Sequence, residues 1–392
     1  MLTDRGWAVL GAGAALVILW VLLGEIELLG AAIILLTAVV LAVLYVRAFS
    51  PIVGVVRKLT PTHVHEGDKA HVDVAITNEG RRPLGNVTLE DSVGVLGSAE
   101  FGIGWLPAGE PARTEYQIVC RPRGAYKVGP MALRVTDPVG LASSSATAGS
   151  IDRLVVFPAV EDLRGFPMTR GKDPAMHASR PEHSQQGGED FYTLREYVQG
   201  DDLRFVHWPS SAKMDELMIR QLETPWQSRA LVMVDVRARA FENADCFEKA
   251  VKGAASVVRH LARSGFDAEL WAGGTSTIGL NRYTDAMEQL ATIERVDRLD
   301  LRQVAARLQR TGRGGVLVIV TGVPDHDVLE AQRLLSREYR TTVVLAASET
   351  ASASAAALHR GGAHTMAVKP DGSWAAAWAT LTEKTWHGSS LV

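Results

Sequence analysis

Two long, uncharged, apolar runs near the start of the chain restrict its fold more than any other feature. Residues 7–23 (17 residues) and 28–46 (19 residues) contain no acidic or basic side chain. A helix needs about 20 apolar residues to cross a bilayer, and about 17 is the lower limit. Only four residues, 24–27, separate the two runs. So short a loop predicts a two-helix transmembrane hairpin within residues 1–50.

The charges around these runs predict the orientation of the hairpin. Arg5 precedes the first run, and Arg47, Arg57 and Lys58 follow the second. The loop between the runs carries two glutamates and no base. Because basic flanks remain on the cytoplasmic side, we expect a multi-pass protein of the inner (plasma) membrane with the bulk of its chain in the cytoplasm. Two alternatives stay open: a cleaved signal peptide at the first run, and an inverted topology that exports the large domains.

The composition excludes several classes of protein. The chain has 392 residues, which predicts two or three domains. Its 41 basic and 44 acidic residues argue against a nucleic-acid-binding protein, which usually carries a basic excess. Cys120 and Cys246 lie in no recognisable nucleophile motif and are too few for a disulfide-stapled domain. We therefore expect two buried thiols.

Residues 52–158 follow a period of two, which is typical of strands. Val72, Val74 and Ile76 alternate with polar or small residues, and residues 78–80 supply a turn. Short alternating runs separated by Gly, Pro and Asn predict an antiparallel β-sandwich. The same alternation recurs at Val87 and Leu89, at Tyr116, Ile118 and Cys120, and at Leu133 and Val135.

Residues 159–226 are expected to form a connector that includes the most distinctive segment of the chain. From residue 164 to residue 186 the chain is polar with scattered Pro, Gly and His, which is typical of an exposed segment. His177 and His183 lie six positions apart, which is not the spacing of one helical face. We therefore expect solvated side chains there rather than metal ligands.

The densest mixture of aromatic, acidic and basic side chains lies at residues 188–213. In and just beyond this signature segment four bases face eight acids. That balance excludes a phosphate-binding stripe and favours ion pairs around a turn. Gly200 gives the backbone the freedom for the turn. Asp201 or Asp202 is expected to cap the next element, and Arg204 to pair with one of these carboxylates.

Two interpretations of the signature segment stay open. Its side chains line a pocket or a contact face for a partner, or they form an internal polar network that fixes how the sandwich meets the next domain. A buried tryptophan beside an arginine also suits an interface hot spot. His207 has the chemistry of a general base, but no nucleophile is paired with it in the sequence, and Ser210-Ser211 lies outside a Gly-x-Ser-x-Gly elbow. The candidate residues are Tyr197, Gly200, Asp201, Asp202, Arg204, His207, Trp208, Ser211, Ala212 and Lys213.

Residues 227–392 alternate between strand and helix patterns. This alternation predicts an α/β domain in which helices cover both faces of a parallel sheet. Trp374 and Trp378 lie four apart and are expected to cover the core on one helical face. Strands are predicted at 230–234, 268–271, 316–320 and 342–345, and helices at 247–261, 286–293, 301–308 and 328–339.

The signature segment resembles that of a bacterial family called domain of unknown function 58. Two phrases in the β-rich region resemble the same family, residues 59–68 and residues 123–141. We expect these phrases to form turns at strand ends without chemistry of their own. The resemblance implies a membrane-anchored protein with a von Willebrand factor A-like domain. Because genes of the family often lie beside those of MoxR-type AAA+ ATPases, it also implies such an ATPase as partner.

The carboxyl ends of the predicted strands carry Asp235 and Thr321, where α/β sheets bind ligands. The metal site of a von Willebrand A domain needs Asp-x-Ser-x-Ser after the first strand, with a threonine and an aspartate from later loops. Arg237 and Arg239 stand at both serine positions. Since Mg²⁺ requires oxygen ligands, Asp235 and Thr321 are degenerate candidates and no bound metal is expected. The arginines are expected to meet an acidic partner or to pair internally with Asp235 or Asp325.

Together these patterns predict a membrane-anchored multidomain protein: a two-helix transmembrane hairpin, an antiparallel β-sandwich, and an α/β von Willebrand factor A-like domain with a parallel sheet. Three hypotheses of function follow. The first is a non-enzymatic scaffold without cofactors that presents its cytoplasmic domains to a protein partner. The second is a metal-dependent protein-binding module. The third is a hydrolase that uses His207 with an aspartate.

Overall fold

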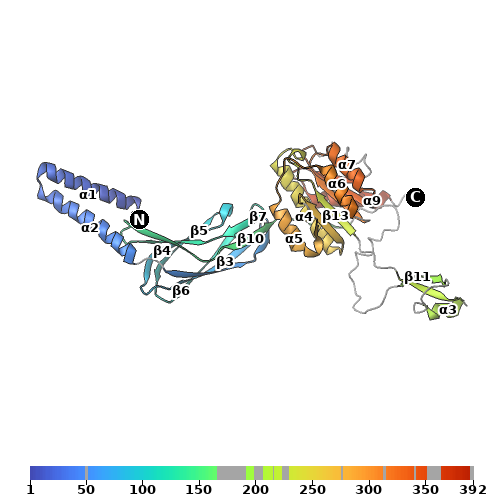
Figure 1. Ribbon diagram of the computed structural model, residues 1–392, viewed down its shortest axis with the longest axis horizontal. Coiled ribbons are helices and arrows are strands. Elements are labelled where there is room, and N and C mark those ends of the chain that lie inside the picture. Colours follow the sequence, from blue (N-terminus) through green and yellow to red (C-terminus); the bar gives the residue numbers. More distant parts are fainter. Residues whose placement is uncertain are drawn as a thin grey trace. The chain divides into compact units, whose positions relative to one another are not determined.

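The computed structural model divides into two compact units, Met1–Ala159 and Val160–Val392. The first holds a helical hairpin and a β-rich body, and the second holds an α/β body and a smaller strand–helix segment (Figure 1). The residues described are 1–48, 52–165, 191–197, 206–214, 216–222, 229–274, 277–311, 315–339, 341–350 and 363–388.

The first unit opens with two long helices, α1 (Asp4–Leu23) and α2 (Ile26–Ala48), which lie side by side as a hairpin (Figure 1). The Thr3 hydroxyl accepts the Gly6 N–H at 3.1 Å and caps α1. Both helices are long and apolar enough to cross a membrane, and only 11% and 22% of their most apolar stretches are buried. They therefore lack the burial of core helices, and they could anchor the chain in a membrane. The loop between them is shorter than predicted, because α2 begins at Ile26, two residues before the second uncharged run.

The foot of the hairpin is attached to the β-rich body. The Thr3 N–H donates to the Leu141 carbonyl at 3.0 Å, and the Ser143 N–H donates to the Met1 carbonyl at 2.8 Å. Leu141 and Ala142 are buried in a cluster with α2 residues. The end of the second family phrase, residues 137–141, is thus a turn at a strand end, as predicted, and in addition it holds the hairpin. The α2 residues buried in this cluster are Val39, Ala42 and Val46.

Gly6 provides a direct test of this attachment. A side chain at Gly6 would collide with the Leu141 carbonyl oxygen, whereas Gly11 on the same helix has open space around it. We expect Gly6→Ala to destabilise the full-length protein by about 1–3 kcal/mol through overpacking. Thermal unfolding in detergent measures the effect. Gly11→Ala is the matched control, and an equal loss in both variants would contradict the attachment.

The β-rich body contains ten described strands in three sheets, ordered β1-β3-β6, β5-β4-β8-β9 and β2-β10-β7. The described pairs are antiparallel except β10 with β2, which is parallel. This corrects the prediction of a wholly antiparallel sandwich. A parallel pair needs a long connection, and the chain between these two strands supplies one. The strands are β1 (Val53–Thr60), β2 (His63–His65), β3 (Lys69–Asn78), β4 (Leu84–Ser92), β5 (Ser98–Leu106), β6 (Pro111–Val119), β7 (Gly124–Val128), β8 (Met131–Thr136), β9 (Ser143–Ala148) and β10 (Asp152–Phe157), with a 3₁₀ turn at η1 (Gly94–Leu96).

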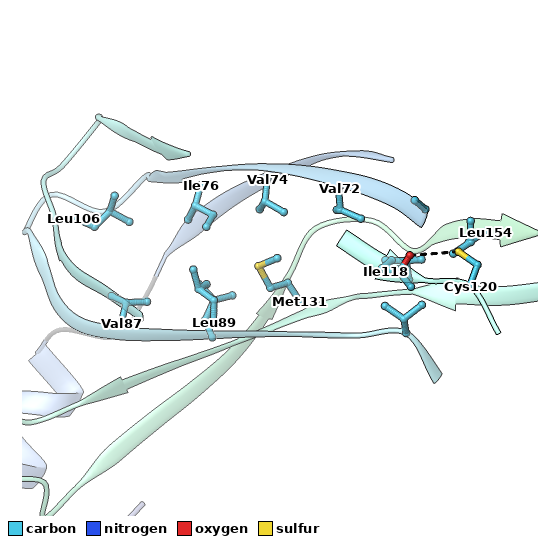
Figure 2. Close-up of a cluster of buried hydrophobic side chains, with 14 of the residues drawn as sticks. Val72, Val74, Ile76, Val87, Leu89, Leu106, Ile118, Cys120, Met131 and Leu154 are labelled. Carbon is cyan, nitrogen blue, oxygen red and sulfur yellow. Dashed lines mark hydrogen bonds between the residues drawn. The ribbon is translucent and has the colours of Figure 1, made fainter. Parts of the chain in front are cut away.

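The core of this body lies between strands that the period of two had identified. Side chains of β3 face Leu89 of β4 and Met131 of β8 (Figure 2). Cys120 is fully buried, and its thiol donates to the Ile118 carbonyl at 3.5 Å. Burial raises the pKa of this thiol and also that of Cys246. The prediction of two buried thiols is confirmed.

A buried ion pair crosses this core. The Arg57 side chain of β1 is 1% exposed, and its Nε and Nη2 donate to the two carboxylate oxygens of Asp91, each at 2.9 Å. The Tyr116 hydroxyl donates to the same carboxylate at 2.5 Å, and Asp152 lies 3.0 Å from Arg57 Nη1. Burial and the bond to Asp91 raise the pKa of Tyr116. The predicted orientation of the hairpin counted Arg57 among the basic residues that follow the second helix. Its side chain is instead buried in the β-rich body, so Arg57 is not a surface charge beside the hairpin.

The second unit is built on a six-stranded sheet of order β15-β14-β13-β16-β17-β18. All of its strand pairs are parallel except β14 with β15. Leu231 and Met233 pack with α6 and α7, while α4 contacts the same strands outside that cluster, so helices cover both faces. The strands are β13 (Arg229–Val234), β14 (Asp267–Ala272), β15 (Ile278–Gly279), β16 (Val316–Thr321), β17 (Thr341–Ala347) and β18 (His364–Val368).

The helices of this unit match the predicted ones, although α7 ends at Leu335 and not at residue 339. Strands β15 and β18 were not predicted, because the first is two residues long and the second begins with polar residues. The helices are α4 (Ala244–Arg263), α5 (Tyr283–Thr292), α6 (Leu301–Thr311), α7 (His326–Leu335) and α9 (Trp374–Gly388), with 3₁₀ turns at η4 (Ala238–Ala240) and η5 (Leu280–Arg282). The smaller segment contains β11 (Phe191–Glu196), α3 (Trp208–Met214) and β12 (Met218–Leu222).

Residues 160–165, predicted as part of the connector, belong to the second unit. The Glu161 carboxylate accepts hydrogen bonds from the Lys249 ammonium at 2.9 Å, the Ser373 hydroxyl at 2.6 Å and the Ala375 N–H at 2.9 Å. Glu161 thereby caps α9. Trp374 and Trp378 are fully buried on one face of α9, as predicted.

Glu161→Gln is expected to destabilise this unit. Burial alone would raise the pKa of Glu161, but bonds from Ser373, Ala375 and Lys249 outweigh it and lower the pKa from 4.5 to about 2. The lost interaction is on the order of 2–3 kcal/mol. Because the folded pKa is depressed, this stability is complete above pH 4.5 and disappears as the pH falls towards 2. Melting temperatures of wild type and variant should therefore converge in acid, while the exposed Glu383→Gln control shows no such difference at any pH.

Candidate functional site

The strand order creates a switch point at the carboxyl end of the sheet. From β13 the chain passes to β14 on one side, and then crosses to β16 on the other. In open α/β sheets ligands bind in the crevice at such a point. Asp235 follows β13, and Thr321 ends β16. The Thr321 hydroxyl donates to Asp235 Oδ2 at 3.0 Å, so the structure brings these two predicted candidates together.

A guanidinium group fills the switch point. Arg237 is 1% exposed, and its Nε and Nη2 donate to the two carboxylate oxygens of Asp235 at 2.9 and 2.8 Å. Its Nη1 and Nη2 donate to both carboxylate oxygens of Asp325 at 2.8 and 3.0 Å. Two bidentate pairs therefore converge on one side chain. The predicted internal pairing of Arg237 is confirmed.

Further charges extend this network from the buried centre to the surface. Asp327 accepts Arg237 Nη1 at 3.1 Å and also Arg239 Nη2. Arg302 Nε lies 2.6 Å from the Glu330 carboxylate. Sequence reasoning missed Asp327 and Glu330. Acidic residues are common in the first turn of a helix and are consistent with the start of α7, but they do not indicate which arginines will contact them.

The electrostatics of the site keep Arg237 charged. Burial on its own would lower the pKa of its guanidinium, but hydrogen bonds to Asp235 and Asp325 outweigh burial and raise that pKa above its ordinary value. Burial would raise the pKa of Asp325, but the bond from Arg237 outweighs this and lowers it. The centre of the site is thus a fixed cation held between carboxylates.

These residues do not fit the divalent metal of a von Willebrand A domain. Both carboxylate oxygens of Asp235 accept hydrogen bonds from Arg237, and the Thr321 hydroxyl donates to one of them. A cation beside Asp235 would have to displace the guanidinium, because the two positive charges repel each other. Over the part of the chain that the structure describes, no group of three or more His, Cys, Asp or Glu side chains could hold a metal ion.

The signature segment forms a second local structure. Strands β11 and β12 pair antiparallel, and α3 lies between them in the sequence. The buried Ser211 hydroxyl donates to the His207 carbonyl at 3.0 Å and accepts the Met218 N–H at 2.9 Å. The Tyr197 N–H donates to the Leu217 carbonyl at 2.8 Å. Ser211 and the Tyr197 backbone therefore hold this structure together.

Other predicted residues of this segment differ from expectation. Trp208 is 67% exposed, so it is not part of a buried tryptophan–arginine cluster within the described residues. His207 Nδ1 lies 2.8 Å from the Ser210 hydroxyl, so a nucleophile does face this histidine. Ala212 and Lys213 are exposed. The predicted residues Gly200, Asp201, Asp202 and Arg204, and also His177 and His183, lie outside the described residues.

Residues 193–349 match the family described as Protein of unknown function DUF58, and they form a domain of that family. The switch-point network and His207 both lie within this range. The uncharacterized protein YeaD of Bacillus subtilis (strain 168) is 25% identical in an alignment of 317 residues, and the match covers 76% of this chain and 77% of that protein.

The solved structures that match part of this chain have low sequence identity and low TM-scores. The CARDB domain of the PF1109 protein from Pyrococcus furiosus, in complex with di-metal ions, has 15% identity and a TM-score of 0.22, and the match covers 27% of this chain and 93% of that one. A chain of the complex between Zinc 2-glycoprotein and Prolactin inducible protein from human seminal plasma has 11% identity and a TM-score of 0.20, over 26% and 93%.

Proposed function

We propose that this chain is a non-enzymatic adaptor that is anchored in the inner (plasma) membrane by its helical hairpin. Both helices span the bilayer, and the β-rich body and the α/β unit lie in the cytoplasm, where they dock a protein partner. The α/β unit is a degenerate von Willebrand factor A-like domain. The observation that carries this proposal is the Arg237 guanidinium at the switch point, with its hydrogen bonds to Asp235 and Asp325.

A filled switch point favours docking over small-molecule chemistry. The position where such sheets bind ligands is taken by a buried side chain of the protein itself. Around it, charged side chains reach the surface: Arg239 is 60% exposed, Arg302 50% and His326 71%. Arginine suits interfaces because its planar fork binds carboxylates bidentately. A partner with an acidic contact surface fits this face.

The partner that we propose is a MoxR-type AAA+ ATPase, on the strength of the family resemblance. Pull-down of tagged full-length protein from detergent extracts tests it. We expect the ATPase in the wild-type eluate, and its loss with Arg239→Glu. The matched control is Arg134→Glu on an exposed position of β8, which should retain it. An eluate without the ATPase in repeated trials would refute the partner.

The orientation has its own test. Protease added to intact spheroplasts should leave the chain beyond residue 47 undigested if that part is cytoplasmic. Digestion of this part from outside would refute the proposed orientation. Permeabilised spheroplasts are the control, because the same protease must then digest it.

A hydrolase is the second candidate, because His207 Nδ1 lies 2.8 Å from the Ser210 hydroxyl. Histidine can activate a serine at this distance. Both residues, however, lie in and before the first turn of α3, where the Ser210 N–H also donates to the His207 carbonyl. A complementation assay in cells separates the two functions. Full activity of His207→Ala and Ser210→Ala would dispose of the hydrolase, and loss of activity in both would favour it over the adaptor.

A further inference from the structure

A cavity lies at the foot of α2, where the helical hairpin meets the β-rich body. Its volume is about 380 Å³. Helix α2 ends at Ala48, which is one wall of the cavity, and the loop after β3 forms another. The described lining residues are Ala48, Ile52, Asn78, Glu79, Gly80, Arg81, Arg82 and Leu84.

The loop that carries the two arginines is held in one shape. Asn78 is 1% exposed, and its Nδ2 donates to the Arg82 carbonyl at 2.8 Å and to the Leu106 carbonyl at 3.1 Å. Its Oδ1 accepts the Gly80 N–H at 2.9 Å. The Glu79 N–H donates to the Ile52 carbonyl at 2.8 Å and ties the loop to the start of β1. The backbone under Arg81 and Arg82 is therefore organised before any ligand binds.

The cavity is basic. Arg81 and Arg82 are exposed at its wall, and Arg47 immediately precedes Ala48. Glu79 is the acid among the described lining residues. Guanidinium groups bind phosphate oxygens with paired, charge-assisted hydrogen bonds. The chemistry of this wall therefore suits a phosphate monoanion or dianion.

The position of the cavity indicates which kind of molecule carries that phosphate. If α2 crosses the bilayer as proposed above, the cavity lies directly after the membrane-spanning helix, at the depth of the lipid headgroups. Hydrogen bonds of Thr3 and Ser143 hold the start of α1 against the β-rich body at the same foot of the hairpin. Basic pockets at this depth bind anionic headgroups. We propose that Arg81 and Arg82 bind the phosphate of an anionic phospholipid, an inference that rests on the proposed insertion of the hairpin.

Lipid retention by the full-length protein tests this site. The protein is purified in mild detergent, equilibrated with mixed micelles of phosphatidylcholine and phosphatidylglycerol, and analysed by native mass spectrometry. We expect the wild type to retain phosphatidylglycerol preferentially. In the double variant Arg81→Ala/Arg82→Ala this retention should fall about fivefold for each of the two arginines removed. The control is Arg113→Ala/Arg134→Ala, which removes two exposed arginines elsewhere on the β-rich body and should retain the lipid.

Three results would overturn the proposal: no preference for phosphatidylglycerol in the wild type, equal retention by both double variants, or complete displacement of the lipid by millimolar inorganic phosphate. The last result would mean that free phosphate is the ligand. Carbonate extraction of membranes tests the hairpin separately. Protein that resists extraction but shows no lipid preference refutes only the lipid site, whereas protein released by carbonate refutes the membrane insertion on which the site rests.

Discussion

Replacing Arg237 by serine is expected to destabilise the α/β unit by about 3–5 kcal/mol, the cost of breaking a buried ion pair. The substitution removes hydrogen bonds to both carboxylate oxygens of Asp235 and of Asp325. Asp235 is fully buried and would keep no compensating charge. Thermal unfolding of the full-length protein in detergent measures the loss.

Arg239→Ser is the matched control, because it removes the neighbouring arginine from the same loop. The Arg239 side chain is 60% exposed, and its pair with Asp327 is expected to contribute no more than about 1 kcal/mol. If both variants lost the same stability, the buried position of Arg237 would not be the cause, and the interpretation of the switch point would be wrong.

The same variant tests the metal-dependent alternative. Arg237→Ser leaves Asp235 and Asp325 facing each other without the guanidinium, and adds a hydroxyl. We expect millimolar Mg²⁺ to raise the melting temperature of this variant, because a ligand that binds only the folded state stabilises it. The wild type should not respond to Mg²⁺ or EDTA. A wild type that is stabilised by Mg²⁺ would restore the metal-dependent binding module as a function.

Replacing Arg57 by leucine should destabilise the β-rich body by a similar amount, about 3–5 kcal/mol. Asp91 is fully buried and accepts two hydrogen bonds from Arg57. Leucine fills the space of the arginine stem but leaves this carboxylate without the guanidinium, while the Tyr116 hydroxyl still donates to it. Hydrogen–deuterium exchange of the full-length protein locates the effect, which we expect in β1 and β4.

Two variants calibrate this second prediction. Tyr116→Phe removes one hydrogen bond to Asp91 and should cost about 1.5–3 kcal/mol, since the acceptor is charged. Arg134→Ala, on an exposed position of β8, should stay within about 0.5 kcal/mol of wild type. Fast exchange confined to the hairpin, with β1 and β4 still protected, would contradict a role of Arg57 in the core.

Periodicity predicted which residues form strands and helices better than it predicted which strands pair with each other. The alternation of Val72, Val74 and Ile76 identified β3 and its buried face, because side chains on a strand alternate between faces. The spacing of Trp374 and Trp378 identified the buried face of α9 in the same way. The parallel pairing of β10 with β2 joins segments far apart in the sequence, and no local pattern could reveal it.

At the candidate site, too, the sequence identified residues but not all of the contacts between them. The strand ends pointed to Asp235 and Thr321, and the arginines after β13 were expected to meet an acidic partner or to pair internally. Sequence alone left open whether Asp235 or Asp325 would be the partner. The structure gives Arg237 both of them, and Asp327 in addition. Asp325 and Asp327 lie 88 and 90 positions away from Arg237, so their approach depends on the order of the strands.

The amino-acid sequence by itself determined the apolar hairpin, the alternating strands and the change to strand–helix alternation after residue 228, because each depends on hydrophobic side chains a few positions apart. Only the tertiary structure decided that the switch point is filled by Arg237, that Arg57 is buried and that residues 140–143 hold the hairpin. These contacts join charges and backbone groups from distant segments, and such groups find their partners only after the strands have paired and excluded water.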